Sequence, residues 1–424
     1  MSREKISGLK TDEQGIIKMK MLLSISWRNI WRHPARSGVL MMAIIAGLWA
    51  GILVTALTNG WIHQRFVNMI QEEITHVQIH HPEFLTEREP WMYIQNKDEI
   101  FRFLERDERV LSWSARTLTD GMIQSPLTTS GVQIRGVQID RERATTTFHE
   151  NLTTGDYLDS ELRNPVLLGE RLADKLNVEV GNRIVLTFQD LENEITSGSF
   201  TITGLFRTAS NPYDERNVFV RSDDLQDLLA GEVVFHEIAI LVDREELSDS
   251  VRTDLNYQFD QIIAETWYEL SPELRYITDA GGNLIVYIMA VILLALAFGI
   301  LNTMLMAIFE RMRELGMLLA IGMSKLRVFV MIMMESVILT MTGAGGGLLL
   351  AWLTLGYLGE KGIDMTSMGG DSMAEFGYDA VVYPIAYTND YVTTIILVVV
   401  TALLAAIYPA IKALRLNPGE VVRE

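Results

Sequence analysis

Residues 283–309 have the sequence "NLIVYIMAVILLALAFGILNTMLMAIF" and lead without a break into "ERMRELGMLLAIGMSK" at residues 310–325. The first segment contains no charged side chain. An α-helix needs only about 20 such residues to cross the roughly 30 Å hydrocarbon core of a bilayer. The second segment is short and charged. Together they predict a transmembrane helix that ends in a compact segment at one membrane surface.

Three further apolar runs complete a set of predicted transmembrane helices, at residues 37–62, 283–309, 326–355 and 391–411. Four buried helices of this length are rare in soluble folds. We therefore predict an α-helical membrane protein with four transmembrane helices plus a large mixed α+β extracytoplasmic domain at residues 63–282.

The charges are unevenly distributed along the chain, whose formal net charge is −18. Residues 1–37, 310–327 and 411–424 together hold 15 basic and 7 acidic side chains. Residues 62–282 hold 20 basic and 40 acidic ones, and residues 356–390 hold 1 and 6. Because Lys and Arg concentrate in cytoplasmic loops, both termini are predicted to be cytoplasmic. The acidic external side argues against nucleic acid as a partner.

The chain contains no cysteine, so the external domain is expected to fold without disulfides. At about 220 residues it is large enough to bury its own core. The first apolar run begins after thirty-six residues and has no A-x-A-like pattern behind it. It is therefore predicted to be a retained anchor and not a signal peptide.

The residues before the first span fall into two parts. Residues 1–20 are polar and are expected to form a cytoplasmic tail. Residues 21–36 predict an amphipathic helix at the membrane interface, with tryptophans at headgroup depth and arginines toward anionic lipid. Its anchoring residues are Trp27, Arg28, Trp31 and Arg32. A plain positively charged flanking segment is the alternative.

The external domain shows period-two patterns bounded by Gly, Asn and Asp, which predict strands. The clearest are "HVQIHH", "GVQIRGVQID", "NRIVLTF", "SFTITGLF", "NVFVR" and "HEIAILV". Helical spacing appears in "DEIFRFLERDERV", "GERLADKLNV", "SDDLQDLLAG" and "SDSVRTDLNYQFDQIIAETWYEL". We expect two subdomains. Residues 356–390, rich in Gly and Met, are expected to form an external loop that rests on the membrane or on a partner.

No phosphate-binding loop, G-x-S-x-G, H-E-x-x-H or C-x-x-C motif occurs in the sequence. The only histidine cluster is in "HVQIHH", where His76 and His80 would share one strand face with His81 beside them. A shared metal is conceivable there, but no carboxylate at comparable spacing supports it. We therefore expect neither a metal nor a cofactor in this chain.

Polar and small residues also occur within the predicted spans. Glu335 lies eight residues after Arg327, about 12 Å of helix rise. Such a residue is functional by default, because exposing it to lipid would cost roughly 2.5 to 3.5 kcal/mol. The alternative is a hydrogen bond that only fixes helix packing. Asn302 places a second polar side chain in the membrane. Close helix approach is expected at Gly343, Gly345, Gly346 and Gly347.

Residues 310–325 are the strongest functional candidate. As a helix, the segment would place Met312, Leu315, Leu319 and Met323 on one side. A simple turn would need only three or four residues and would leave this stripe unexplained. Because the chain lacks a phosphate-binding loop, energy must enter from another protein. We predict that this segment transmits force from a cytoplasmic partner into two transmembrane helices.

The sequence also resembles a known family, the permease subunits of MacB-like ABC transporters (the type VII group). Residues 311–350 are similar to their FtsX-like domain, in which R-x-x-E-[IL]-G precedes a turn glycine, an intramembrane glutamate and further glycines. The matching residues are Arg311, Glu314, Leu315, Gly316, Gly322, Glu335 and Gly345 to Gly347. Those that match the family's C-terminal ending are Pro409, Ala413, Pro418 and Val421.

The external domain resembles the MacB-like periplasmic core domain in "GVQIRGVQID", "LTTGDYL", "VLLGERLADKLNVEVGNRIVL" and "FTITGLFRT". Within the family, "SWRNIWRHPARSG" and "EEITHVQIHHPEF" resemble lipoprotein-releasing (Lol-type) permeases. The resemblance implies an FtsX-like permease domain at residues 283–424, with residues 412–424 as a cytoplasmic C-terminus. It places the external domain in the periplasm and the chain in the bacterial inner membrane.

The resemblance further implies a dimer of permeases, homomeric or heteromeric, bound to separate cytoplasmic ATPase subunits that hold ATP and Mg. This chain would then not be an enzyme. It would transmit ATP-driven motion to the periplasmic domain and release lipoproteins, or another amphiphile, to a periplasmic carrier. The ATPase-coupling contact would be made by Arg311, Arg313, Glu314, Leu315 and Gly316.

Two alternatives remain from the sequence. The first is an FtsX-like mechanotransmitter that regulates a periplasmic partner, such as a cell-wall hydrolase, and moves no substrate. The second is a membrane-anchored enzyme, and the histidine cluster is the only sequence feature that supports it.

Overall fold

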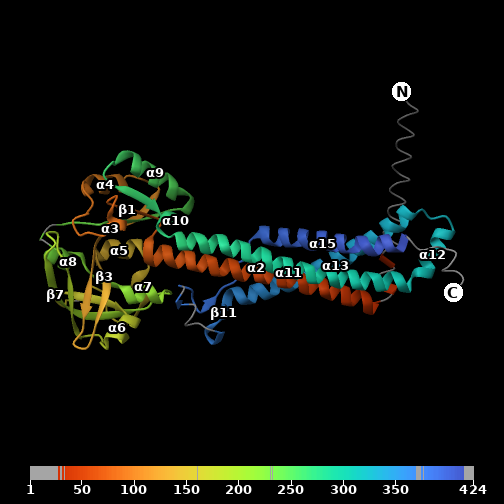
Figure 1. The fold of residues 1–424 in the computed structure, drawn as a ribbon, viewed down its shortest axis with the longest axis horizontal. Coiled ribbons are helices and arrows are strands. Elements are labelled where there is room, and N and C mark those ends of the chain that lie inside the picture. Colours follow the sequence, from red (N-terminus) through yellow and green to blue (C-terminus); the bar gives the residue numbers. More distant parts are fainter. Residues whose placement is uncertain are drawn as a thin grey trace, which may run out of the picture. The chain divides into compact units, whose positions relative to one another are not determined.

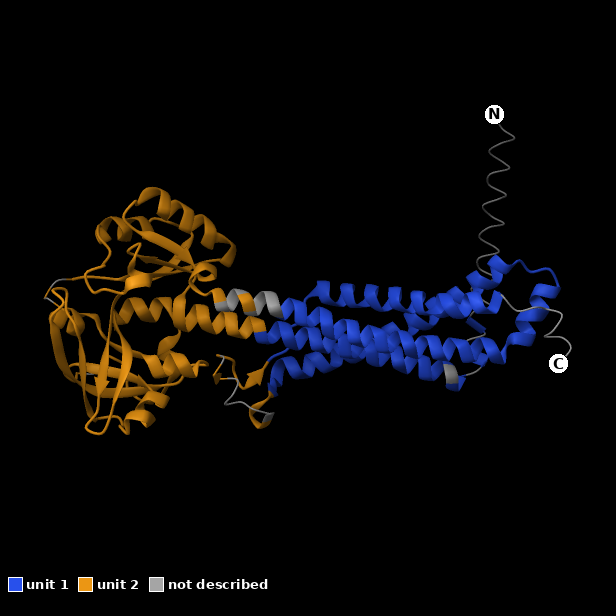
Figure 2. Cartoon of the chain, in the orientation of Figure 1, with its two compact units in different colours: residues 1–61, 280–363, 383–424 blue, residues 62–279, 364–382 orange. Residues whose placement is uncertain are grey.

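The computed structural model describes residues 27–28, 31–32, 34–159, 161–229, 231, 233–368, 374–375 and 377–414 (Figure 1). It divides into two compact units (Figure 2). The helical unit comprises Met1–Trp61, Ala280–Ile363 and Tyr383–Glu424. The sheet unit comprises Ile62–Asp279 and Asp364–Val382.

The helical unit is built from helices long and apolar enough to cross a membrane. Among the described residues there are four: α2 (Pro34–Asn68), α11 (Pro272–Glu310), α13 (Lys325–Lys361) and α15 (Thr388–Leu414). One apolar cluster runs through them, with Leu48, Ile300, Val328 and Ala406 fully buried. The sequence of α2 crosses from the helical unit into the sheet unit, and that of α11 crosses from the sheet unit into the helical unit.

These helices are longer than the predicted spans. Helix α11 has 39 residues and begins at Pro272, where the sequence predicted a span from residue 283. At 1.5 Å per residue it is about 58 Å long, well beyond the hydrocarbon core. Apolarity marks only the part of a helix that can lie in lipid, so the polar extensions of α11 and α13 could not be recognised from it.

A short helix, α12 (Met312–Ala320), lies between α11 and α13. Gly322 follows it at φ 101°, a backbone conformation that glycine adopts without steric cost, and this lets the chain turn into α13. Figure 1 shows α12 at the end of the helical unit where α11 and α15 end. There the Nζ of Lys412 lies 4.8 Å from the ring centroid of Phe309.

The sheet unit is built on a ten-stranded mixed sheet with the order β10-β1-β9-β2-β3-β8-β5-β7-β4, in which β6 also pairs with β2 and β7. Its strands are β1 (Val77–His80), β2 (Val110–Gln124), β3 (Thr129–Val137), β4 (Leu152–Gly155), β5 (Pro165–Gly169), β6 (Arg183–Gln189), β7 (Ile195–Phe206), β8 (Asn217–Arg221), β9 (Glu237–Val242) and β10 (Ile263–Thr266).

Short helices cover the sheet. They are α3 (Phe84–Glu87), α4 (Lys97–Leu104), α5 (Ile139–Thr145), α6 (Glu170–Leu176), α7 (Asn211–Arg216), α8 (Ser222–Leu229), α9 (Ser248–Gln258) and α10 (Trp267–Leu270). Single turns form the π-helix η1 (Met69–Ile74) and the 3₁₀ helices η2 (Phe148–Asn151) and η3 (Glu245–Leu247).

Two main apolar cores lie along the sheet, and β2 belongs to both. One core packs α4 and α9 against β1, β9 and the first half of β2. The other packs α6 and α8 against β3, β5, β6, β7, β8 and the end of β2. Strand β2 pairs with β9 up to Arg116 and with β3 from Arg116 onward. Arg116 therefore stands where the two halves of the sheet meet.

The mixed α+β fold class is confirmed, and strands lie in all six predicted strand segments. Two helical predictions were wrong in part. The pattern in "DEIFRFLERDERV" ends at Leu104, and Val110 already belongs to β2. The pattern after Ser248 ends at Gln258 and is followed by β10, because this segment pairs with β1. Tertiary pairing overrode local helical spacing in both places.

The external loop predicted at residues 356–390 is more structured than expected. Helix α13 continues to Lys361, and β11 (Ile363–Asp364) pairs with β12 (Val381–Val382). In the sheet unit, Gln64 donates a hydrogen bond to the Val381 carbonyl and Asn68 donates one to Asp379. The described residues of the loop thus contact the last turns of this chain's own α2.

Candidate functional site

Helix α12 presents one face to the helical unit and another to solvent. Leu315 is buried, and Leu319 and Met323 pack on the same apolar cluster. On the other face, Met317 is 51% exposed and Ile321, just beyond the helix, is 85% exposed. Neighbouring exposed apolar side chains can contact another protein or the membrane surface.

The residues predicted as an ATPase contact do not share one face. Arg311, Leu315 and Gly316 are turned inward, whereas Arg313 is exposed and Glu314 is partly exposed. The apolar stripe that the sequence revealed is therefore mainly the packing face. The accessible face is the opposite one, which carries Arg313, Met317 and Ile321.

Arg311 joins α12 to α13 through Glu335. Its Nη1 donates hydrogen bonds to both carboxylate oxygens of Glu335 at 3.1 Å. The two side chains are only 11% and 9% exposed. Such a charge-assisted pair is strong when shielded from water. The intramembrane acid that the sequence singled out is thus bound to a cation from the adjoining segment.

Glu314 extends this contact into a chain of four charges. The Nε of Arg311 donates to Glu314 at 3.4 Å, and the Nη1 of Arg32 donates to Glu314 at 3.2 Å. The segment before α2, helix α12 and helix α13 are thereby linked. Residues that the sequence assigned to an anchor, a coupling contact and an intramembrane site form one network. We call it the coupling network: Arg32, Glu314, Arg311 and Glu335.

Sequence reasoning missed the Arg311–Glu335 pair, because the partners are 24 residues apart. The turn at Gly322 brings α12 back beside the start of α13. A usable signal did exist, since a buried acid needs a counter-charge and Arg311 lies at the membrane end of the neighbouring span.

Three of the four predicted packing glycines lie against α2. A Cβ added at Gly343 would lie 2.9 Å from the Cβ of Ile44, and one at Gly346 would lie 2.9 Å from Cδ1 of Ile45. One at Gly347 would lie 3.0 Å from Cδ2 of Leu48. At Gly345 there is open space. Asn302 is exposed on α11.

The predicted interfacial anchor is described only in part. Trp27 and Trp31 are exposed, and their ring centroids are 5.9 Å apart. Arg28 is also exposed, while Arg32 belongs to the coupling network. The remaining residues predicted for this helix before Pro34, the tail at 1–20 and the C-terminal Pro418 and Val421 lie outside the described residues.

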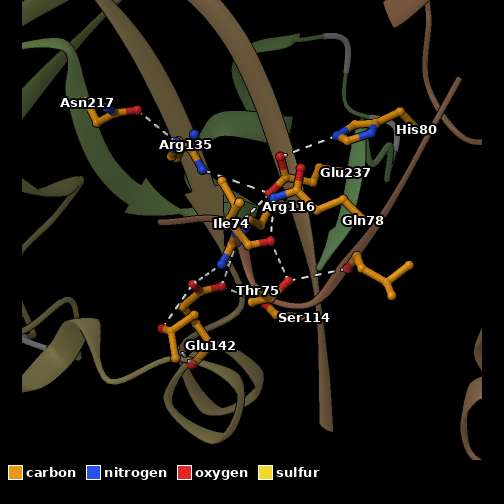
Figure 3. A network of polar contacts seen from close by, with 12 residues as sticks. Ile74, Thr75, Gln78, His80, Ser114, Arg116, Arg135, Glu142, Asn217 and Glu237 are labelled. Atoms are coloured by element: carbon orange, nitrogen blue, oxygen red, sulfur yellow. Dashed lines mark hydrogen bonds and ion pairs between the residues drawn. The ribbon is translucent and has the colours of Figure 1, made fainter. Parts of the chain in front are cut away.

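A second charged network lies inside the sheet unit, and Figure 3 shows it around Arg116. Arg116 on β2 donates to Glu142 on α5 through Nε at 3.0 Å and Nη2 at 2.6 Å. Its Nη1 donates to Glu237 on β9 at 2.6 Å. All three side chains are at most 5% exposed. We call these residues the Arg116 network. The sequence analysis did not predict it.

Polar neighbours complete the Arg116 network. Ser114 donates to Glu142 at 2.7 Å, and His80 Nε2 lies 3.4 Å from Glu237. Arg135 Nη1 lies 3.8 Å from the same carboxylate. Burial opposes ionisation of Glu237, but Arg116, helped by His80 and Arg135, holds its pKa well below its usual range. The network therefore keeps Glu237 ionised where the two halves of the sheet meet.

The histidine cluster is dispersed in the structure. His80 contacts Glu237, His76 Nδ1 accepts from the backbone N–H of Val242, and His81 Nδ1 accepts from Glu83. Burial lowers the pKa of His76. Among the described residues no group of three or more His, Cys, Asp or Glu could hold a metal ion. The geometry gives no support to the metal-site alternative.

Comparison with known protein families gives two matches that together cover most of the chain. The MacB-like periplasmic core domain matches residues 37–257, which is more than half of the chain. This chain belongs to the MacB-like and FtsX-like family of ABC transporter permeases. The second match, to the FtsX-like permease C-terminal domain, covers residues 286–418 of this permease.

The permease is similar to curated proteins and to a solved structure. The lipoprotein-releasing system transmembrane protein LolC of Neisseria meningitidis is 22% identical over 334 residues, which are 74% of this chain and 76% of that one. LolC of Xylella fastidiosa is 23% identical over 305 residues, 68% and 72% of the two chains. The periplasmic region of MacB from Actinobacillus actinomycetemcomitans is 12% identical, with a TM-score of 0.34, over 48% of this chain and 94% of that one.

The family membership defines the general class of the protein. It is an ABC transporter permease of the MacB, FtsX and LolC type. The four apolar helices and the periplasmic-domain match fit an inner-membrane protein with a periplasmic domain.

Proposed function

We propose that this permease transmits the ATP-driven motion of a separate cytoplasmic ATPase to its periplasmic sheet unit, and thereby releases lipoproteins or another amphiphile from the inner membrane. The observation that carries the proposal is the Arg311–Glu335 pair, which ties the short helix α12 to the transmembrane helix α13. ATP and Mg would be held by the ATPase and not by this chain.

The ATPase would dock on the exposed face of α12. Arg313, Met317 and Ile321 offer one cation and two apolar side chains there. The basic character of residues 310–327 and of both terminal segments supports a cytoplasmic position for this face. Arg311, Glu314, Leu315 and Gly316 would act behind it, by fixing α12 to the helical unit.

Displacement of α12 would pass into the spans as rigid-body motion. Separating Arg311 from Glu335 in a poorly solvated setting is costly, so α12 and the start of α13 would move together. Helix α13 packs closely on α2 at Gly343, Gly346 and Gly347. Because α2 and α11 continue in sequence into the sheet unit, they provide a covalent helical route for this motion.

A second permease subunit is proposed to cover α11. This helix is the least buried of the four spans. Its exposed face carries Tyr287, Val291, Phe298, Asn302 and Met306. A polar amide exposed in a span gains a hydrogen bond when a second helix covers it. The partner would be a second copy of this chain or a related permease.

Lipoproteins are the proposed substrate because the two LolC relatives carry that function in their names and match across most of their length. The test is to purify the chain with its co-expressed genomic neighbours and identify what accompanies it. An ABC ATPase together with acylated lipoprotein is the expected result. A cell-wall hydrolase in place of lipoprotein would favour the FtsX-like regulator, and absence of any ATPase would contradict both.

A paired substitution tests the docking face. Met317→Ala with Ile321→Ala removes two exposed apolar side chains from it, and recovery of the ATPase should fall about tenfold. Leu404→Ala, an exposed apolar residue on α15, is the matched control and should leave recovery unchanged. Equal ATPase recovery from both variants would place the docking face elsewhere.

A further inference from the structure

A cavity of about 490 Å³ in the sheet unit gathers arginines from three different elements. Arg88 follows α3, Arg135 lies on β3 and Arg216 ends α7. The only carboxylate among the lining residues is Asp120. Residues 62–282 carry twice as many acidic as basic side chains, so this arginine cavity is a local reversal of charge.

Sheet geometry explains why the cavity is polar on one face. Asp120 on β2 pairs with Gln133 on β3, and Gln133 pairs with Asn217 on β8. Cross-strand partners lie on the same face, and Arg135 shares that face because it is two residues from Gln133. Gly131 adds no side chain, and a Cβ there would meet nothing within 4 Å.

The cationic groups of the cavity are incompletely paired. Arg88 lies 3.7 Å from Asp120, and both side chains are half exposed. The side chain of Arg216 has no hydrogen bond or ion pair with any other described residue. Arg135 is buried: its Nε donates to Asn217 at 2.8 Å, and its guanidinium carbon lies 5.6 Å from the ring centroid of Tyr213. Its Nη1 is shielded from solvent and makes no hydrogen bond to any described atom, and its ion-pair partner Glu237 lies 3.8 Å away. Figure 3 shows Arg135 between Asn217 and Glu237.

We propose that the arginine cavity binds a phosphate group. Three guanidinium groups approaching from separate elements suit a tetrahedral anion, whose oxygens accept hydrogen bonds from several directions. A planar carboxylate would be satisfied by one guanidinium fork and would leave the others unpaired. The bound group would be a free phosphate ester or the phosphate of a lipid headgroup. The proposal is independent of the proposed transport function.

Phosphate binding would also affect the contacts where the two halves of the sheet meet. Arg135 lies 3.8 Å from Glu237, which is hydrogen-bonded to Arg116. A phosphate that recruits Arg135 would compete with Glu237 for the same guanidinium. The site therefore connects an accessible anion to the Arg116 network.

The test measures phosphate affinity by calorimetry on the full chain in detergent, in a chloride buffer. The probes are inorganic phosphate, glycerol 3-phosphate and short-chain phosphatidylglycerol, each up to millimolar concentration. Arg88→Gln with Arg216→Gln should weaken binding about tenfold or more. Arg183→Gln with Arg244→Gln, two exposed arginines outside the cavity, removes the same charge and should change affinity less than about twofold.

The arms of the experiment separate the sources of the phosphate group. Binding of inorganic phosphate or glycerol 3-phosphate identifies a free ester, and binding of phosphatidylglycerol alone identifies a lipid headgroup. The proposal is overturned if no probe binds the unmodified chain, or if the cavity variant and the control variant bind equally well.

Discussion

The two charged networks differ in how completely they are enclosed. In the Arg116 network, Arg116 and Glu142 are each 1% exposed and every bond is made within the sheet unit. The coupling network instead has a buried end and an exposed end. The buried end is the pair Arg311–Glu335, and the exposed end is the pair Arg32–Glu314, whose side chains are 65% and 44% exposed. One network is closed to water, and the other is open at one end.

This difference indicates different roles for similar chemistry. Removing one member of a closed network leaves an uncompensated buried charge, so the network holds a single arrangement. An exposed ion pair contributes little and can break and re-form without large cost. The coupling network can thus stay fixed at Glu335 and still exchange partners at Arg32. Four predictions test the comparison, from the largest expected effect to the smallest.

The Arg116 network should be the more costly to break. Arg116→Met leaves the buried carboxylates of Glu142 and Glu237 without their counter-charge and should destabilise the sheet unit by about 3 to 5 kcal/mol. Hydrogen exchange of β2 amides in the full chain measures the loss. Arg244→Met, an exposed arginine, is the control and should change stability by less than about 0.5 kcal/mol. If the triple change Arg116→Met/Glu142→Leu/Glu237→Leu cost more than Arg116→Met alone, stranded charge would not be the cause.

The buried end of the coupling network should show strong pairwise coupling. In a double-mutant cycle of Arg311→Met and Glu335→Gln, the interaction should be about 1.5 to 3 kcal/mol, as for hydrogen bonds between charged groups. Thermal unfolding of the full chain in detergent provides the four stabilities. Additive effects of the two substitutions would show that the pair makes no specific contribution.

The closed network also predicts a pH dependence. Glu237 has a folded-state pKa well below its usual range. Its contribution to the stability of the sheet unit is therefore present above about pH 4.5 and is lost as the pH falls further. For this one group, the free energy of unfolding changes by at most roughly 1.4 kcal/mol per pH unit. Glu237→Gln should reduce the acid sensitivity of β2 hydrogen exchange relative to the unmodified chain. An unchanged slope in the variant would assign the acid sensitivity to other groups.

The exposed end of the coupling network should matter least for stability. Arg32→Ala should change unfolding by only about 0.2 to 1 kcal/mol, and less in high salt, because its pair with Glu314 is solvated and screened. Unfolding at two salt concentrations measures this. If Arg32→Ala lowered the free energy of unfolding as much as Arg311→Met, the two ends of the network would not differ in their contribution to stability.

The sequence was informative where patterns are local and uninformative where contacts are distant. Apolar length revealed the spans, and period-two alternation revealed strands such as β6 and β8. The strands β2 and β10 were missed, because sheet pairing is not encoded in local spacing. Within the candidate site, Glu335 was recognised by its charge, but its partner Arg311 depended on the turn at Gly322.

The Arg116 network illustrates the same limit. Along the chain, Glu142 lies 26 residues and Glu237 lies 121 residues after Arg116. Each looks like an ordinary surface charge in the sequence. Only the pairing of β2 with β9 and the position of α5 bring them together, so no local pattern could have identified them.

The most direct test of the transmission proposal is the amount of substrate released per ATP hydrolysed by the reconstituted complex. With Arg311→Ala and Glu314→Ala, hydrolysis should persist while release per ATP falls about tenfold, equivalent to about 1.4 kcal/mol, in a subunit that is still inserted and dimeric. Glu360→Ala with Lys361→Ala, which removes two exposed charges at the other end of α13, is the control. Unchanged release per ATP in the Arg311 and Glu314 variant would contradict the proposal that α12 carries the motion.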